Sequence, residues 1–451
     1  MTLPFEKPQR QDIHKMIRLA VPVVIVQVGM MLFGVVDTMV VGRLSSQALA
    51  AVALGHVAVI TISAFGVGLL LGIDPLLNQA LGADDRNAFR RSAQRGLILA
   101  AALMIPSTVF LLPIGGILAL LGQPPDVVPL AAAYSRISIP GLLPFYGWGV
   151  FRLVLQSMGR LRPIVATVIV VNIFNLVADW ALVFGAGPIP QLGPIGSAWA
   201  STIARTLLFV IILIVDRRDL WPLLRFERAS TQWRPLLRTA RLGIPIGFNL
   251  QLEIVAFSVI ALLMGGMGAA TMAAHQVAIN IASLTFMVPL GIAQATAVRV
   301  GNAIGAGDGS GARRAASSGL ILGAGFMTLT AMLFIGLPTW LARAYTSVDE
   351  VLLLAAALIP IAGFFQVFDG LQVVAAGVLR GAGDTRAPLV VNILGFWCIG
   401  LPTSLVLGFT LDYGPQGLWW GLVAGLFAVA FFLMARVAFM LRGKIARVEV
   451  E

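Results

Sequence analysis

The 451-residue chain carries very little charge for its size, and this shortage excludes most soluble classes of protein. Only 11% of its residues are charged, whereas 59% are hydrophobic. Soluble domains carry about 25% charged residues, and a single soluble core stops growing near roughly 250–300 residues. A chain without a charged surface must expose most of that surface to lipid. The composition therefore excludes a soluble enzyme, a nucleic-acid-binding domain and a disordered chain.

Cysteine and histidine are also scarce. The single cysteine, Cys398, can form no internal disulfide, and the three histidines are scattered at His14, His56 and His275. No lysine follows the glycine pattern of a Walker A loop, which excludes ATP hydrolysis by that route. Neither metal-ligand spacing nor a paired nucleophile and base is present. We therefore predict that the chain is not an enzyme.

Long apolar runs, in contrast, are abundant. A helix needs roughly 20 apolar residues to cross about 30 Å of hydrocarbon, and about twelve stretches reach that length. The fold class predicted is an all-α polytopic membrane protein, with both chain ends on the same side. The stretches lie near residues 16–41, 48–80, 93–121, 128–158, 163–185, 194–215, 242–264, 270–303, 315–343, 350–379, 388–409 and 415–441.

The arginines predict the orientation in the membrane. The net charge of +11 comes mainly from arginines in alternate loops and in the two tails. Loops rich in Lys and Arg stay in the cytoplasm. The loop after the second stretch carries Arg86, Arg90 and Arg91, whereas the opposite loops hold little beyond Arg43 and Arg343. Both termini are therefore predicted to be cytoplasmic.

An internal repeat divides the chain. Four short motifs recur at one constant separation: Leu19–Pro22 with Leu242–Pro245, Gln79–Ala83 with Asn302–Ala306, Arg90–Arg91 with Arg313–Arg314, and Gly96–Leu99 with Gly319–Leu322. Such a register indicates a duplicated block of six helices, and transporters place substrate between halves of this kind. We predict an N-lobe at 1–216, a basic cytoplasmic linker at 217–241 lying on anionic lipid, and a C-lobe at 242–451.

Acidic side chains lie well inside the predicted helices, at Asp37, Asp179, Glu253 and Asp369. Each costs roughly 2.5–3.5 kcal/mol at the middle of a membrane helix, and ionisable groups kept there usually line an ion path or a water-filled cavity. We interpret the four as groups that bind and release a proton or a cation, the other interpretation being structural carboxyl groups between helices. Asp74 lies beside a basic loop, where a structural ion pair is the better interpretation.

Side-chain amides accompany these acids at helical spacing. An amide can hydrogen-bond a protonated carboxyl group or share the coordination of a hard cation, which prefers oxygen ligands. Gln276 and Asn280, four residues apart, either contact substrate or join helices. The accompanying amides are Asn172 and Asn175 before Asp179, Asn249 before Glu253, and Gln366 and Gln372 on either side of Asp369.

At these residues the sequence resembles the multidrug and toxic compound extrusion (MATE) family, and within it the NorM-like branch. The resemblance covers essentially the whole chain. Three motifs carry it: Val36–Gly42 with Leu49–Gly55 resembles the first helix and its loop, Leu242–Gly247 leading to Glu253 resembles the seventh helix, and Asp369–Gln372 with Leu379–Thr385 resembles the tenth helix and the following loop.

The resemblance implies twelve helices in two pseudo-twofold-related lobes around a V-shaped cleft. It also implies export of organic, mostly cationic compounds across the bacterial inner membrane in exchange for Na⁺ or H⁺. The partners expected are small organic cations and membrane lipid, not nucleic acid. No cofactor is expected apart from the coupling ion, and the protein is expected to be a monomer.

The resemblance further assigns roles to individual residues. Glu253 and Asp369 would form a C-lobe cation site, which would bind sodium if the carrier is sodium-coupled. NorM-like members tend to carry an amide at the position of Asp179, whereas members of the DinF-like branch carry an aspartate there. This chain therefore has the acids of both branches, and the branch alone does not identify the coupling ion. The N-lobe site would comprise Asp37, Asn175 and Asp179, with Asn172 and Ser201 as further members.

The runner-up function is a lipid-linked saccharide flippase of a related fold. Such a carrier needs cationic groups that bind pyrophosphate, and the intramembrane candidates are Arg136, Arg152 and Arg205. Several acids lie at the same depth, so the sign of the charge favours cationic cargo. A membrane-embedded enzyme is the third and weakest alternative.

Overall fold

The computed structural model describes residues 5–186, 190–443 and 445–448. Over this part of the chain, twelve helical spans are long and apolar enough to cross a membrane, which confirms the predicted all-α architecture. The spans are Arg10–Val41, Ser46–Gly82, Arg86–Leu111, Val128–Ser157, Arg162–Phe184, Pro194–Val215, Trp233–Gly266, Ala269–Gly305, Gly309–Gly336, Asp349–Gly381, Arg386–Thr410 and Gly414–Arg442.

Some spans consist of several helices in series. The first half of the chain forms α1 (Arg10–Val41), α2 (Ser46–Leu70), α3 (Asp74–Gly82), α4 (Arg86–Ala102), α5 (Met104–Leu111), α6 (Ile114–Leu120), α7 (Val128–Ser157), α8 (Arg162–Phe184), α9 (Pro194–Val215) and α10 (Arg217–Leu220). The second half forms α11 (Trp233–Gly266), α12 (Ala269–Gly305), α13 (Gly309–Gly336), α14 (Pro338–Arg343), α15 (Asp349–Gly381), α16 (Arg386–Asn392), α17 (Leu401–Leu405) and α18 (Gly414–Arg442). Short 3₁₀ turns lie at Leu71–Ile73, Trp221–Leu224 and Arg228–Ser230, and π-helical turns at Ile393–Gly400 and Val406–Thr410.

The largest differences between the helix limits and the hydropathy prediction lie in three places, each with a local cause. Helix α11 begins at Trp233, ahead of the expected residue 242. The intervening residues are rich in arginine and leucine, which are good helix formers although they are not uniformly apolar. The third and ninth stretches are interrupted near Pro113 and Pro338 because proline lacks a backbone N–H. Their remainders form the separate helices α6 and α14.

Helices α4 and α13 begin with the same aspartate cap, and the two caps occupy equivalent positions of the repeat. The Asp85 carboxylate accepts a hydrogen bond from the backbone N–H of Ala88 at 2.9 Å, at the start of α4. The Asp308 carboxylate accepts one from the backbone N–H of Gly311 at 2.7 Å, at the start of α13. An aspartate cap stabilises a helix by about 1 kcal/mol. Because the two aspartates are separated by the same interval as the repeated motifs, the repeat extends from sequence to local structure.

Backbone contacts divide the chain into two compact units. The N-unit comprises Ile25–Leu77 and Asp85–Gly247, and the C-unit comprises the described residues within 1–24, 78–84 and 248–449. The first half of α1 and the end of α3 therefore pack with the second half of the chain, and the first part of α11 packs with the first half. Each unit is a bundle of membrane-length helices.

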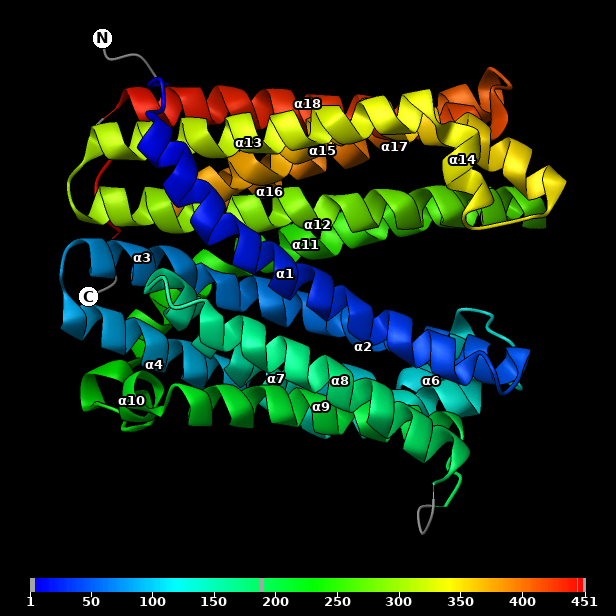
Figure 1. Cartoon of the computed structure of the whole chain (residues 1–451), viewed down its shortest axis with the longest axis horizontal. Helices are drawn as coiled ribbons and strands as arrows, with labels where there is room; N and C mark the ends of the chain where they lie inside the picture. Colours follow the sequence, from blue (N-terminus) through cyan, green and yellow to red (C-terminus); the bar gives the residue numbers. More distant parts are fainter. Residues whose placement is uncertain (1–4, 187–189, 444, 449–451) are drawn as a thin grey trace. The chain divides into compact units, whose positions relative to one another are not determined.

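In the N-unit, α7 packs against both α2 and α9, and α8 packs against α9 (Figure 1). The start of α11 approaches the end of α2 at glycines on both sides. A Cβ atom on Gly72 would lie 2.4 Å from the backbone nitrogen of Gly243, and one on Gly68 would lie 2.6 Å from the Cα of Gly247. Small residues of this kind let membrane helices approach to backbone contact.

In the C-unit, α12, α13 and α18 all pack against α15. The start of α1 lies over α12 and α13 (Figure 1). The largest fully buried side chains of this core include Phe334, Phe365 and Trp419. Trp419 stacks on Phe365 with ring centroids 5.5 Å apart, and its indole N–H donates to Nδ1 of His275 at 3.2 Å. The polar atom of the buried indole is thus satisfied inside the core.

The repeated glycine motifs meet each other within the C-unit. A Cβ atom on Gly82 would lie 2.0 Å from the carbonyl oxygen of Asn302. A Cβ atom on Gly305 would lie 2.0 Å from the carbonyl oxygen of Gln79. The two contacts exchange under the repeat, as expected at a local twofold axis. Glycine recurs in both motifs because each backbone carbonyl occupies the space that a side chain would need.

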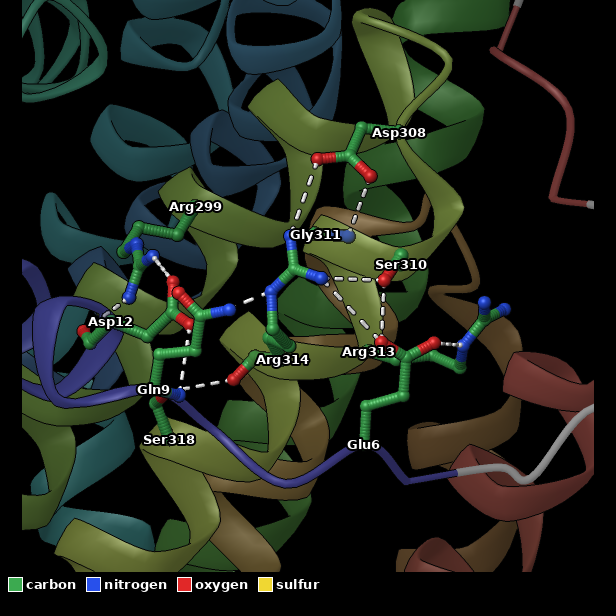
Figure 2. Close-up of polar contacts among 10 residues, drawn as sticks. All are labelled: Glu6, Gln9, Asp12, Arg299, Asp308, Ser310, Gly311, Arg313, Arg314 and Ser318. Carbon is green, nitrogen blue, oxygen red and sulfur yellow. Dashed lines mark hydrogen bonds and ion pairs between the residues drawn. The ribbon is translucent and has the colours of Figure 1, made fainter.

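An ion-pair cluster fixes the segment before α1, together with the first turn of α1, to α12 and α13 (Figure 2). The Arg313 Nε donates to Oε1 of Glu6 at 2.6 Å. The Asp12 carboxylate accepts a hydrogen bond from Arg299 at 3.0 Å. Arg314 lies between the two acids, 3.5 Å from a carboxylate oxygen of each. Five charged groups thus hold the lead-in to α1 at the end of the C-unit.

The N-unit contains an equivalent ion pair. Arg90 of α4 pairs with Glu227, which precedes α11, at 3.0 Å. Arg90 and Arg313 occupy equivalent positions of the repeat, so corresponding arginines bind the lead-in segments of α11 and α1. Hydrogen bonds from Ser310 and Arg313 to the Glu6 carboxylate hold the pKa of Glu6 below its ordinary value of 4.5.

We expect the Glu6→Gln substitution to loosen the segment before α1 in a pH-dependent way. Because the folded-state pKa lies below the unfolded value, Glu6 stabilises this segment above pH of about 4.5, and the effect disappears as pH falls through the folded pKa. Hydrogen–deuterium exchange at residues 5–12 should be faster in the variant at pH 7 and equal to wild type at low pH. Glu350→Gln, at an exposed site at the start of α15, serves as the control. Equal exchange at pH 7 would contradict the assignment.

Candidate functional sites in the two units

The Asp37 carboxyl group lies fully buried in the N-unit, on the second half of α1. Its Oδ2 atom accepts two hydrogen bonds from neighbouring helices: one from the Tyr134 hydroxyl of α7 at 3.1 Å and one from the Ser201 hydroxyl of α9 at 2.6 Å. Both donors are neutral. They orient the carboxyl group without cancelling its charge, so the ionised form still lacks a countercharge from these two residues.

The Asp179 carboxyl group is the direct neighbour of Asp37. Asp179 lies on α8, is fully buried, and accepts a hydrogen bond from Asn175 Nδ2 at 3.2 Å. Its carboxyl group also lies close enough to Asp37 to interact with it electrostatically. Two carboxylates have no donor between them, so a hydrogen bond joining two carboxyl groups requires a proton on one of them. We name Asp37, Asp179, Asn175, Tyr134 and Ser201 the N-unit site.

The Asn172 amide is directed elsewhere. Its Nδ2 donates to the backbone carbonyl of Val168, one turn earlier on the same helix, at 2.8 Å. The helical spacing that placed Asn172, Asn175 and Asp179 on one face thus brings Asn175 to the acid but leaves the Asn172 donor bound to its own helix. Such back-bonding to the preceding turn competes with longer-range contacts.

A second acidic pair lies in the C-unit. Glu253 of α11 and Asp369 of α15 are close enough to interact electrostatically. Gln372, one turn after Asp369, donates from Nε2 to Oε1 of Glu253 at 3.2 Å. Asp369 and Gln372 are buried and Glu253 is half-buried. We name these three residues the C-unit site. Its carboxylate and amide oxygens are ligands that suit a hard monovalent cation such as sodium.

The remaining polar residues predicted for the sites form hydrogen bonds with polar side chains other than the four acids. Asn249 accepts a hydrogen bond from Asn392 at 2.6 Å, where α16 passes into a π-helical turn. Gln366 donates to the Thr285 hydroxyl at 2.6 Å and so joins α15 to α12. The exposed Gln276 lies 3.5 Å from Asn280, at the long end of hydrogen-bond distance. These two partners lie on one helix, and this bond joins no second helix.

Sequence reasoning missed three partners of the predicted residues, namely Tyr134, Thr285 and Asn392. Tyr134 had a detectable signal, because it lies in an apolar stretch together with Ser135 and Ser138, which marks a polar side of α7. A buried tyrosine hydroxyl also needs a hydrogen-bond partner. The other two gave no such signal, because their hydrogen bonds depend on packing between helices distant in sequence.

Among the residues that the structure describes, no group of three or more His, Cys, Asp and Glu side chains could hold a metal ion. What each site offers is a pair of carboxyl groups with neutral hydrogen-bond donors. Such a pair can hold a proton, or a weakly held monovalent cation with additional oxygen ligands.

The comparisons with known proteins identify the class. The sequence model of the MatE family matches residues 22–181 and 245–406. The two matches begin at Pro22 and Pro245, which are equivalent positions of the internal repeat. The chain belongs to the MatE family, and it is an integral membrane protein with twelve candidate spans.

Several bacterial relatives are similar over nearly the full length. The probable multidrug resistance protein NorM of Mesorhizobium japonicum is 36% identical over 95% of this chain and 94% of its own. The multidrug resistance protein NorM of Burkholderia vietnamiensis is 36% identical over 93% of this chain and 92% of its own. The multidrug resistance protein MdtK of Photorhabdus laumondii is 31% identical over 95% of each chain.

Solved structures share the fold. A eukaryotic MATE transporter superposes with a TM-score of 0.86 at 23% identity, over 96% of this chain and 98% of that chain. A MATE transporter of Vibrio cholerae gives a TM-score of 0.86 at 19% identity, over 96% of this chain and 97% of that chain. The twelve-helix fold of this chain is therefore that of the MATE transporters.

We expect the Ser201→Ala substitution to destabilise the N-unit, because it removes the shortest hydrogen bond to Asp37 and leaves a buried carboxyl oxygen with one donor fewer. Hydrogen bonds between membrane helices contribute about 0.6 kcal/mol on average and up to about 1.7. Unfolding at increasing concentrations of a denaturing detergent should show a decrease in the free energy of unfolding within that range. The matched control is Ser138→Ala, because the buried Ser138 hydroxyl donates only to the Tyr134 carbonyl of its own helix. Equal losses in both variants would contradict the role of Ser201.

Proposed function

We propose that the protein is a multidrug efflux antiporter of the bacterial inner membrane, with both termini in the cytoplasm. It exports organic, mostly cationic compounds in exchange for Na⁺ or H⁺, and its two lobes, residues 1–216 and 242–451, expose their sites alternately to the two sides. Membership of the MatE family and the multidrug resistance names of the bacterial relatives support efflux. The proposed working form is a monomer.

The observation that carries the coupling proposal is the pair of neighbouring carboxyl groups inside each unit, of which only Glu253 is half-buried and the others are buried. Asp37 and Asp179 in one unit accept hydrogen bonds from hydroxyl and amide groups, and Glu253, beside Asp369 in the other unit, accepts one from an amide. An ionised carboxyl group in hydrocarbon costs roughly 2.5–3.5 kcal/mol, and two of them side by side also repel. A proton, a sodium ion or a cationic cargo removes this cost. These three occupants therefore compete for the same negative charge.

Because the cargo and the ion compete for the same negative charge, binding of one releases the other. When the carboxylates face the outside, entry of a proton or sodium ion neutralises them and releases a cationic cargo. When they face the cytoplasm, the ion leaves and the negative charge becomes available to the next cargo. The same carboxylates cannot hold both occupants at full affinity, so uptake of the ion and export of the cargo are coupled.

The two sites favour different ions by their composition. In the N-unit site two neighbouring carboxyl groups suit a proton, because a proton bound to one of them can form a hydrogen bond to the other. The C-unit site combines Glu253, Asp369 and the Gln372 side chain, whose oxygens suit sodium. The coupling ion is therefore a proton if the N-unit site binds and releases it during transport, and sodium if the C-unit site does.

The alternative, a lipid-linked saccharide flippase, would need cationic groups at the cargo sites. Both sites described above are acidic, which favours cationic cargo. A membrane-embedded enzyme would act without an ion gradient, so dependence on a gradient distinguishes it from a carrier.

The test is ethidium transport by proteoliposomes under an imposed proton or sodium gradient. We expect Asp37→Asn and Glu253→Gln each to lower gradient-driven transport by at least about tenfold, because a neutral amide side chain can no longer exchange a charge, and tenfold corresponds to about 1.4 kcal/mol. A proton gradient should no longer drive transport by Asp37→Asn, and a sodium gradient should no longer drive transport by Glu253→Gln.

Asp349→Asn is the control, because Asp349 is exposed at the start of α15 and outside both sites. Wild-type rates in both site variants would refute the coupling proposal. Export of ethidium by wild type at equal rates with and without either gradient would refute antiport as a whole.

A further inference from the structure

His56 is a titratable side chain inside the N-unit that the exchange described above does not use. It is half-buried on α2, and its imidazole ring reaches the second half of α1. A Cβ atom on Gly34 of α1 would lie only 2.7 Å from the His56 Nε2 atom, so a residue larger than glycine would displace the ring. The chain thus keeps an imidazole pressed against the helix that carries Asp37.

The ring lies within about one helical turn of the acid pair. Gly34 precedes Asp37 by three residues, and residues at this spacing are neighbours on one side of a helix. His56 and Asp37 are accordingly close enough to interact electrostatically. Asp37 in turn interacts with Asp179. His56 therefore approaches the N-unit site from α2, a helix that supplies none of the five residues named for that site.

One nitrogen of the His56 ring has an unmet hydrogen-bond requirement. The Nδ1 atom is buried and has no hydrogen-bond partner among the residues that the structure describes. A buried polar atom without a partner costs about 1–3 kcal/mol. His275 shows the contrasting case, because its Nδ1 atom accepts the indole N–H of Trp419. His56 can therefore bind a proton at Nδ1 without giving up a hydrogen bond, whereas His275 cannot.

The charges that face His56 determine when its ring can hold a proton. Arg205 of α9 interacts with His56, and its positive charge opposes an imidazolium. Tyr134 of α7, which lies against the neighbouring Gly55, is uncharged, and α5, which also packs against α2, carries no ionisable side chain. Asp37 is the negative charge that interacts with the ring within the described structure. An imidazolium is therefore favoured here while Asp37 is ionised, and a cation bound to Asp37 removes that stabilisation.

We propose that His56 is a further proton-binding residue of the N-unit site, whose imidazolium form neutralises Asp37 and so helps to displace a cationic cargo. The proton comes from the solution and binds to the lone pair of a ring nitrogen, and no other bond breaks. A cargo that binds to Asp37 takes over the negative charge and releases this proton. The proposal rests on the proposed efflux function and adds one residue and one proton to it.

The direct test is to observe the ionisation of His56 by nitrogen-15 NMR, with protein labelled at histidine in phosphatidylcholine nanodiscs. The chain has three histidines, so the His56 signals are those missing from His56→Gln, or those that remain after His14→Gln and His275→Gln are compared. Wild type and Asp37→Asn are titrated between about pH 5 and 8, the range in which histidine ordinarily changes its charge. Each titration is repeated with saturating ethidium.

We expect His56 to titrate within this range in wild type. Its midpoint should fall by at least about one pH unit in Asp37→Asn, and also in wild type with ethidium, because each change removes the negative charge that stabilises the imidazolium. A His56 ring that stays neutral throughout in wild type would overturn the proposal. The same midpoint in wild type and Asp37→Asn would also overturn it.

Transport measurements distinguish a failure of this proposal from a failure of the efflux function. Under an imposed proton gradient, His56→Gln should need at least about threefold more protons outside for half-maximal ethidium export. The control is His14→Gln, because His14 is exposed near the start of α1 and its ring contacts the carbonyl of Arg10. A lower maximal rate with an unchanged proton dependence would mean that the His56 ring only packs against α1. A wild type that exports ethidium under neither a proton nor a sodium gradient would instead refute the proposed efflux function.

Discussion

The difficulty of placing carboxyl groups in hydrocarbon governs the arrangement of both sites. Asp37, Asp179 and Asp369 are buried in membrane-length helices, and Glu253 is half-buried beside Asp369. The hydrogen-bond donors to Asp37, Asp179 and Glu253 are hydroxyl and amide groups, which orient the carboxyl groups but supply no positive charge. If stability were the only requirement, apolar residues would serve better at these positions, because buried polar groups seldom stabilise a fold more than well-packed hydrocarbon does. Keeping the acids unneutralised makes the affinity for a proton, a sodium ion or a cationic cargo a property of the site.

The duplicated sequence supplies the framework that holds these acids. Aspartate caps at the starts of α4 and α13, and arginine pairs to the segments before α1 and α11, all recur at the same separation. Close glycine contacts allow backbone approach in each unit. The acids themselves do not follow the repeat: the N-unit site uses α1 and α8, whereas the C-unit site uses α11 and α15. The duplication thus conserves the packing of the two units while their chemistry has diverged.

Most of the fold could be predicted from the sequence, because each span needs a run of apolar residues that is visible without knowledge of its neighbours. The repeat could be predicted for the same reason, since it is a comparison of the chain with itself. The grouping of acids was partly predictable: helical spacing placed Asn175 beside Asp179 and Gln372 beside Asp369. Spacing on one helix could not show that Tyr134 donates to Asp37, or that Asn172 bonds to its own backbone. Those outcomes depend on packing between distant helices and on competition with local acceptors. The assignment of the first half of α1 to the C-unit also depends on long-range contacts, which hydropathy does not contain.

If cargo and coupling ion compete for the same carboxyl groups, binding of the cargo must release the ion, and this release can be measured. Purified protein in weakly buffered detergent solution would be mixed with saturating ethidium, while a pH indicator and a sodium electrode record the solution. The account predicts that protons or sodium ions are released in proportion to the ethidium bound, and that the double variant Asp37→Asn with Glu253→Gln releases none. Tight ethidium binding by the wild type without release of either ion would contradict it.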